Sequence, residues 1–190
     1  MAHTGLGWEL YEKGQFDEAI AQYQRAIDIN PNFAEVHNNF GLALFQKGQL
    51  DAALNEYLKA EDLNPNTSQI PNNMGLVFAQ KGRVDEAILQ YQKALNANPN
   101  FVEAHNNLGM SLAQKGYLDE AIAEYKDVLS LVPEQAETHN NLGIAFAQKG
   151  EMSEAVAEFR EAIRLKPDYV TAQNNLTRAE ASLTHSPDLK

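Results

Sequence analysis

One spacing dominates this sequence, because glycine and proline each recur every 34 residues along most of its length. The glycines are Gly14, Gly48, Gly82, Gly116 and Gly150, and the prolines are Pro31, Pro65, Pro99, Pro133 and Pro167. Two more series keep the same interval, namely Gly7, Gly41, Gly75, Gly109 and Gly143, and Ala19, Ala53, Ala87, Ala121 and Ala155. Chance does not produce four series in one register, and a fixed period of this length is typical of stacked repeat proteins.

Each period reads as two helices. From His37 to Lys47 the apolar residues fall at helical spacing, and the segment stops at Gly48. Glycine just past a helix end adopts the left-handed cap conformation at little cost, and the lysine before it faces the negative end of the helix dipole. The second helix is expected to end at or just before its proline, whose ring excludes the preceding residue from helical geometry.

The second helix of each unit is expected to open at a residue with a short side-chain oxygen. Such an oxygen can accept hydrogen bonds from the unpaired amides of the first helical turn. The residues at this place are Asp17, Asp51, Asp85, Asp119 and Ser153. Within a unit, Gly41 and Ala53 are expected to let the two helices pack tightly, with Tyr57 and Ala60 meeting the next unit.

Single units of this kind cannot bury their apolar faces, so they must stack on their neighbours into a solenoid. The predicted repeats cover residues 1–33, 34–67, 68–101, 102–135 and 136–169. Residues 170–184 resemble a sixth first helix with Thr177 in place of the glycine, and are predicted to form a capping helix with a polar outer face. Residues 185–190 are predicted to form a loose tail.

The repeat resembles the tetratricopeptide repeat (TPR) family. The second unit carries that family's pattern as His37, Phe40-Gly41, Leu44, Ala53, Tyr57, Ala60 and Pro65. The resemblance covers about residues 1–169. It implies an all-α fold, a right-handed α-solenoid of about five 34-residue helix-turn-helix repeats plus a C-terminal capping helix. It also implies that the first helices line an inner, concave surface.

Two features depart from this pattern. Pro71 takes the place of His37, which is tolerable only in the first helical turn, where the missing amide hydrogen had no partner. The first unit begins abruptly and carries Gly5 and Gly7 in its first helix. This suggests that the chain was cut from a longer one or frays there.

An asparagine pair recurs in every unit after the first, although asparagine is a poor former of helix interiors. The pairs are Asn38-Asn39, Asn72-Asn73, Asn106-Asn107, Asn140-Asn141 and, in the cap, Asn174-Asn175. The resemblance places the second asparagine of each pair on the inner surface. This arrangement is similar to the asparagine ladder in the TPR region of the peptide O-linked N-acetylglucosamine transferases. A primary amide offers the donor and the acceptor that match one peptide unit of an extended ligand.

Apolar residues one turn further on are expected to share this surface. They are Leu42, Leu76, Met110 and Ile144, with Phe45 nearby. A row of surface apolar residues favours a binding groove. Together with both asparagines of the pairs in the second to fifth units, these residues form the predicted peptide-binding set. The alternative is that the asparagines are background copied by duplication of the repeat.

Composition excludes several functional classes. The protein has 26 acidic and 15 basic residues and a net charge of -11, which argues against nucleic acid and favours a neutral or basic protein partner. It has no cysteine, so disulfides and thiolate chemistry are absent. No apolar run is long enough for direct membrane insertion and no export signal is seen, so a cytoplasmic location is expected.

No catalytic residues, metal site or cofactor are predicted. The histidines His3, His37, His105 and His139 come one per repeat, too far apart to bind one metal together, and are interpreted as packing residues. Lysines such as Lys47 are interpreted as helix caps. The predicted function is a non-catalytic adaptor that binds an extended peptide. Two alternatives are a substrate-recruiting region of a larger enzyme, such as a peptide glycosyltransferase, and a scaffold that assembles with itself.

Overall fold

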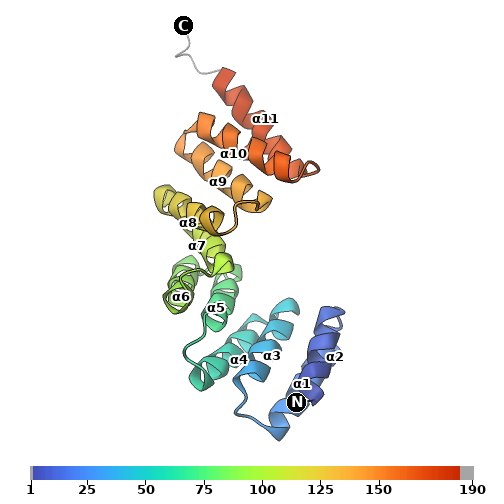
Figure 1. Cartoon of the computed structure of the whole chain (residues 1–190). Helices are drawn as coiled ribbons and strands as arrows, with labels where there is room; N and C mark the ends of the chain where they lie inside the picture. Colours follow the sequence, from blue (N-terminus) through green and yellow to red (C-terminus); the bar gives the residue numbers. More distant parts are fainter. Residues whose placement is uncertain (1, 185–190) are drawn as a thin grey trace. The chain divides into compact units, whose positions relative to one another are not determined.

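The computed structural model describes residues 2–184, and these residues form eleven α-helices and no strand (Figure 1). The helices are α1 (Ala2–Glu12), α2 (Phe16–Ile29), α3 (Ala34–Gln46), α4 (Leu50–Leu63), α5 (Gln69–Gln80), α6 (Val84–Ala97), α7 (Val102–Gln114), α8 (Leu118–Leu131), α9 (Ala136–Lys149), α10 (Met152–Leu165) and α11 (Val170–Thr184). The predicted tail, residues 185–190, lies outside the described residues. None of the helices in residues 2–184 has the length and hydrophobicity that a bilayer-spanning segment needs.

The chain divides into two compact units, of which the first ends at Pro99 and the second begins at Asn100. In the first unit, α1 packs on α2, α3 on α4 and α5 on α6, and these pairs stack through α2 on α3 and α4 on α5. In the second unit, α7 packs on α8 and α9 on α10, with α8 on α9 and α10 on α11. Each unit is therefore a stack of antiparallel helix pairs, as the 34-residue period predicts.

The first helices of the repeats form the inner layer of each unit. In the first unit α3 contacts both α1 and α5, and in the second α9 contacts both α7 and α11. Among the described residues, the backbone of α4 packs against neither α2 nor α6, and that of α8 does not pack against α10, although Lys93 Nζ of α6 reaches Glu61 Oε1 of α4 over 2.7 Å. Because helices on the inner side of a curved stack approach each other more closely, the first helices line the concave side of each unit.

The glycine that follows each first helix has the predicted left-handed conformation, with φ between 71 and 87°. At Gly48 the glycine amide donates to the carbonyl oxygen of Phe45 over 2.9 Å, and the amide of Gln49 donates to Leu44 over 2.9 Å. These bonds satisfy carbonyl groups that the end of the helix would leave unpaired. The second helices end before their prolines, as predicted, with α2 stopping at Ile29 and α4 at Leu63.

The prediction that the second helices are capped by Asp17, Asp51, Asp85, Asp119 and Ser153 is wrong. α2 begins at Phe16, so Asp17 is its second residue, and the preceding Gln15 makes no side-chain capping bond. In α4, α6, α8 and α10 the predicted cap is likewise the second residue of the helix, and the residue at the cap makes no side-chain capping bond. The four aspartates lie inside the first turn, where their negative charge interacts favourably with the positive end of the helix dipole, and in α10 Glu154 lies in this turn beside Ser153.

The displaced aspartates pair with a lysine of the following repeat. Lys47 Nζ lies 2.9 Å from Asp17 Oδ2, and Lys149 Nζ lies 2.6 Å from Asp119 Oδ1. Lys81 pairs in the same way with Asp51 and lowers the pKa of that carboxyl group, mainly by its hydrogen bond. Lys47, Lys81 and Lys149 therefore link successive repeats, in addition to lying at helix ends.

Pro71 is the third residue of α5, which confirms that it occupies the first helical turn. Its place in α3 is taken by His37, whose Nδ1 lies 2.7 Å from Glu56 Oε2. The residue that corresponds to Glu56 in the next repeat is Gln90, and its buried Oε1 atom has no hydrogen-bond partner among residues 2–184. The loss of the histidine thus leaves one polar atom of the following helix unsatisfied.

Candidate peptide-binding grooves

A groove in the first unit, called groove 1, runs across α1, α3 and α5. It has a volume of about 620 Å³. It is lined by Thr4, Gly5, Trp8, Phe33, Ala34, Glu35, Asn38, Asn39, Asn64, Thr67, Gln69 and Ile70. Three successive inner helices and the loops that precede α3 and α5 thus contribute to one continuous surface.

The chemistry of groove 1 is mixed. Trp8 is 39% exposed and stacks on Tyr11 with ring centroids 5.3 Å apart, which holds the indole in place at one end. Asn38 and Asn39 supply amide groups in the middle of the groove. Glu35 is the one charged residue of the lining, and no basic side chain within residues 2–184 pairs with it. A negative charge without a partner in a groove attracts a cationic group of a ligand.

The second unit holds two smaller grooves along α9. Groove 2 has a volume of about 240 Å³ and is lined by Met110, Ala113, Gln114, Tyr125, Asn141, Ile144 and Gln148. Groove 3 has a volume of about 270 Å³ and is lined by Ile144, Ala147, Gln148, Met152, Phe159, Asn175, Arg178, Ala179 and Ser182. Ile144 and Gln148 line both, so the two grooves adjoin on the inner layer of this unit.

The asparagines also hydrogen-bond to one another between repeats. Asn73 Nδ2 donates to Asn38 Oδ1 over 3.0 Å, and Asn175 Nδ2 donates to Asn140 Oδ1 over 3.0 Å. In both pairs the second asparagine of one repeat reaches the first asparagine of the repeat before it. Each donating amide retains a second N–H and an acceptor oxygen. The asparagine series is therefore partly an internal link between inner helices.

The predicted site residues differ in how far a ligand could reach them. Asn72 and Asn140 are only 6% and 2% exposed, so packing shields both from a ligand. Half-buried members are Asn38, Asn73, Asn106, Asn107, Asn141, Leu42, Leu76, Ile144 and Phe45. Met110 is 55% exposed, and Asn39, although buried, lines groove 1. Leu42, Leu76 and Phe45 do not line any of the three grooves described.

Asn106 is held by two residues at the start of α9. Its Nδ2 donates to Gln135 Oε1 over 3.1 Å, and its Oδ1 accepts from Thr138 Oγ1 over 2.9 Å. Both functional groups of this amide are therefore engaged within the second unit.

Several groove residues were missed at the sequence level. Trp8 lies 34 residues before Leu42, in register with the predicted apolar row, so the repeat pattern contained the signal for it. Phe33, Asn64 and Thr67 come from loops between repeats, and only the stacking of the repeats brings them to groove 1.

Comparison with known proteins agrees with this architecture. The family model described as TPR repeat matches residues 7–48, 41–82, 75–116, 110–150 and 145–179. The chain belongs to the tetratricopeptide repeat family. A comparison with curated protein sequences finds no significant match.

Several solved structures resemble this TPR protein. YrrB, described as a TPR protein with an unusual peptide-binding site, is 24% identical with a TM-score of 0.74, over 90% of this chain and 89% of that one. MamA is 25% identical with a TM-score of 0.77, over 86% of this chain and 96% of that one. TTC0263, a thermophilic TPR protein of Thermus thermophilus, is 21% identical with a TM-score of 0.70, over 95% of this chain and 98% of that one.

The histidines of the TPR units lie between the helices of a repeat. His3, His37, His105 and His139 each place Nδ1 on a side chain of the paired second helix, at 2.8, 2.7, 2.6 and 2.6 Å. The partners are Gln22, Glu56, Glu124 and Glu158. At His37 the other ring nitrogen lies 2.7 Å from the carbonyl oxygen of Pro31. This histidine is 3% exposed and joins the two helices of its repeat to the loop that precedes them.

Proposed function

We propose that this TPR protein is a protein-interaction module that holds an extended, neutral or basic peptide segment of a partner on its inner helices. The observation that carries the proposal is the composition of groove 1, where an aromatic side chain, two asparagine amides and an unpaired carboxylate line one surface. This combination suits a peptide backbone with an apolar and a cationic side chain.

Each part of groove 1 has a distinct role in this proposal. Asn38 Oδ1 accepts from Asn73, and Asn38 Nδ2 donates to Asn39 Oδ1 over 3.4 Å, so the N–H groups of Asn38 and Asn39 that these bonds leave over donate to carbonyl oxygens of the peptide backbone. This holds the ligand without reading its side chains. Trp8 supplies a rigid flat surface for an apolar or cationic side chain. Glu35 selects a lysine or arginine near the middle of the segment. The description of YrrB as peptide-binding is consistent with this role for a related fold.

The position of Trp8 makes a direct test possible, because it is the only tryptophan of the sequence and it lines groove 1. Peptides are first selected from a displayed library of random extended sequences. A selected peptide is then titrated into the protein while Trp8 fluorescence is recorded. We expect a saturable change in the emission and an enrichment of lysine or arginine among the selected sequences.

Two variants and two matched controls decide whether groove 1 is responsible. Glu35→Lys and the double variant Asn38→Ala/Asn39→Ala are each expected to weaken binding at least about tenfold, the loss of about 1.4 kcal/mol. Asp28→Lys makes the same change of charge on the exposed side of α2, and Asn55→Ala removes an exposed asparagine of α4. Both controls should bind as the wild type does, provided that all variants have similar melting curves.

Other outcomes would change the assignment. If the groove variants bind like the wild type, the asparagines are copied repeat background and the proposal for groove 1 is wrong. If no peptide binds and the sedimentation coefficient rises with concentration, assembly of the protein with itself is favoured. If the Asp28→Lys variant binds basic peptides as weakly as the Glu35→Lys variant does, the attraction of these peptides to the acidic protein is nonspecific.

A further inference from the structure

Among residues 2–184, the fourth repeat contains a cluster of potential metal ligands that the other repeats lack. His105 on α7 and Glu124 on α8 form the same contact as His37 with Glu56 and His139 with Glu158, so this contact by itself is a packing feature. The difference lies one turn further along the second helix, three residues after the glutamate. Lysine occupies that place at Lys59 and Lys93, and aspartate occupies it at Asp127.

Where aspartate replaces lysine, the positive charge that balances the glutamate carboxylate is lost. In the second repeat, Lys59 Nζ lies 2.7 Å from Glu56 Oε1 and neutralises that carboxylate. In the fifth repeat the corresponding residue is Glu161, which Arg164 holds at 2.6 Å. Within residues 2–184, neither Glu124 nor Asp127 has a lysine or arginine partner. Two carboxylates on one face of α8 thus lie beside the imidazole of His105, and no lysine or arginine of residues 2–184 balances their charge.

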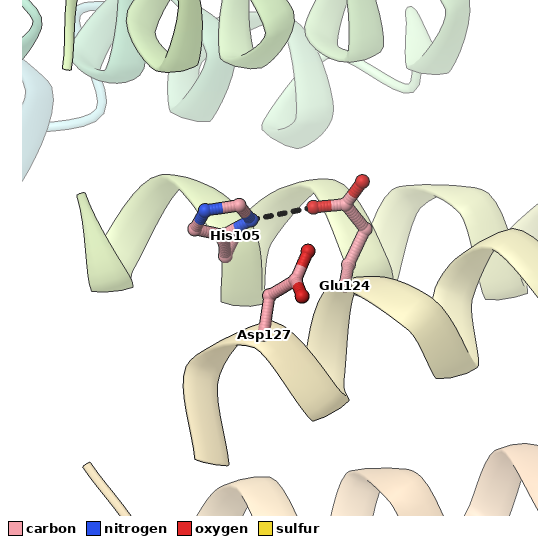
Figure 2. Close-up of side chains that lie close together, drawn as sticks. All are labelled: His105, Glu124 and Asp127. Atoms are coloured by element: carbon pink, nitrogen blue, oxygen red, sulfur yellow. Dashed lines mark hydrogen bonds and ion pairs between the residues drawn. The ribbon is translucent and has the colours of Figure 1, made fainter. Parts of the chain in front are cut away.

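We propose that His105, Glu124 and Asp127 bind a divalent transition-metal ion, with Zn²⁺ as the best match. One imidazole nitrogen and two carboxylate oxygens form a donor set that suits Zn²⁺, and a water molecule would complete four-coordination. The Nδ1 atom of His105 and one oxygen of each carboxylate all lie within 4.8 Å of one another. Figure 2 shows the imidazole and both carboxylates converging on one point between α7 and α8.

Metal entry requires only small movements of these side chains. Donors about 2.0–2.2 Å from a tetrahedral Zn²⁺ ion lie roughly 3.4 Å apart. The 2.6 Å contact between His105 Nδ1 and Glu124 Oε2 therefore has to open by about 1 Å, while the Asp127 carboxylate moves inward. Rotation of the glutamate and aspartate side chains can supply this change. His105 is 8% exposed and the backbone of the packed helix pair holds it in position.

The exposure of the cluster suits entry of an ion from solvent. The side chain of Glu124 is 21% exposed, and Asp127 is exposed at the surface. Binding would cross-link α7 to α8 and stabilise the second unit, because the unfolded state does not hold the three donors together.

The test uses the untagged protein, ZnCl₂ in isothermal titration calorimetry and CoCl₂ in absorption spectroscopy. We expect one Zn²⁺ ion per molecule, a higher melting temperature with Zn²⁺, and visible Co²⁺ bands of four-coordinate intensity. Asp127→Lys recreates the lysine of the second and third repeats, and Asp127→Asn keeps the shape of the side chain. Both should keep the helical spectrum and weaken Zn²⁺ binding at least about tenfold.

A variant designed to create a second metal site provides the matched control. Lys59→Asp places the same three residue types at His37, Glu56 and position 59, so we expect the stoichiometry to rise to two ions per molecule. The absence of Zn²⁺ binding by the wild type at millimolar concentration would overturn the proposal. Equal binding by the wild type and both Asp127 variants would also overturn it, because the ion would then be held elsewhere.

Discussion

The ring of Tyr57 lies directly on the backbone of Gly41, and a Cβ atom added at Gly41 would be 2.5 Å from Tyr57 Cε1. The same relationship joins Gly7 to Tyr23, Gly75 to Tyr91, Gly109 to Tyr125 and Gly143 to Phe159. The glycine on the first helix and the aromatic residue on the second are therefore one packing unit, repeated in every helix pair. The sequence predicted that Gly41 marks a close approach, but placed Ala53 opposite it and Tyr57 against the next repeat.

The first prediction concerns this contact. Gly41→Ala is expected to lower the free energy of unfolding by about 1–3 kcal/mol, because the buried Tyr57 ring cannot move away without disturbing the core. Urea denaturation followed by circular dichroism measures the change. Gly5→Ala is the control, since no neighbouring atom of residues 2–184 lies within 4 Å of its added Cβ. It should leave stability unchanged or raise it by up to about 1 kcal/mol. Equal effects of the two substitutions would show that helix propensity, and not the Tyr57 contact, governs Gly41.

The second prediction compares Glu56 with Gln90, which occupy the same repeat position. Glu56→Leu is expected to cost about 1–3 kcal/mol, because it leaves the buried His37 Nδ1 atom without its partner. Gln90→Leu removes a buried oxygen that has no partner, so its stability should match or exceed that of the wild type. Thermal and urea melts of the two variants test this difference. A loss of stability at Gln90 as large as that at Glu56 would contradict it.

The third prediction separates the structural from the proposed binding role of the asparagines. The bond from Asn73 Nδ2 to Asn38 Oδ1 is expected to contribute about 0.5–1.5 kcal/mol to the stability of the first unit. A double-mutant cycle with Asn38→Ala, Asn73→Ala and the combined variant measures this coupling. Additive effects of the two single substitutions would show that the bond adds no stability. Asn141→Ala, which removes a side chain that lines groove 2, should change stability less.

The fourth prediction concerns alkaline pH. Burial raises the pKa of Tyr23, Tyr57, Tyr91 and Tyr125. In the unfolded state these phenols lose their protons at a pH of about 10, whereas the folded state retains them. The unfolded state therefore binds fewer protons at high pH, and the free energy of unfolding should fall as the pH rises above about 10.

Ultraviolet phenolate absorbance and urea melts at several pH values measure this effect. The control is Tyr125→Phe, because Phe159 already occupies the same place in α10. It should lose less stability between neutral and alkaline pH than the wild type does. Phenolate absorbance from these four residues in a protein that is still folded near pH 10 would count against the predicted effect of burial.

Much of the fold follows from the sequence because its signals are local. The five glycines that end the first helices adopt positive φ because glycine has no Cβ atom to oppose it. The prolines end the second helices by excluding the preceding residue from helical geometry. Pro71 could be placed in the first turn of α5 because proline has no amide hydrogen, and the amides of the first turn have no partner within the helix. Each of these interactions involves residues a few positions apart, so reading a short segment is sufficient.

Contacts between residues about 20 to 35 positions apart depended on the tertiary structure. The sequence identified Asp17 as a residue near a helix start, but the stacking of repeats places it on Lys47. It identified the asparagine series, but the packing of inner helices decides that Asn73 binds Asn38 while Asn72 is buried. It placed the histidines one per repeat, too far apart to share a metal, and the packing of α7 on α8 brings two carboxylates to His105 instead. The period determined that the helices stack, whereas the rotation of each helix about its axis determined which side chains meet.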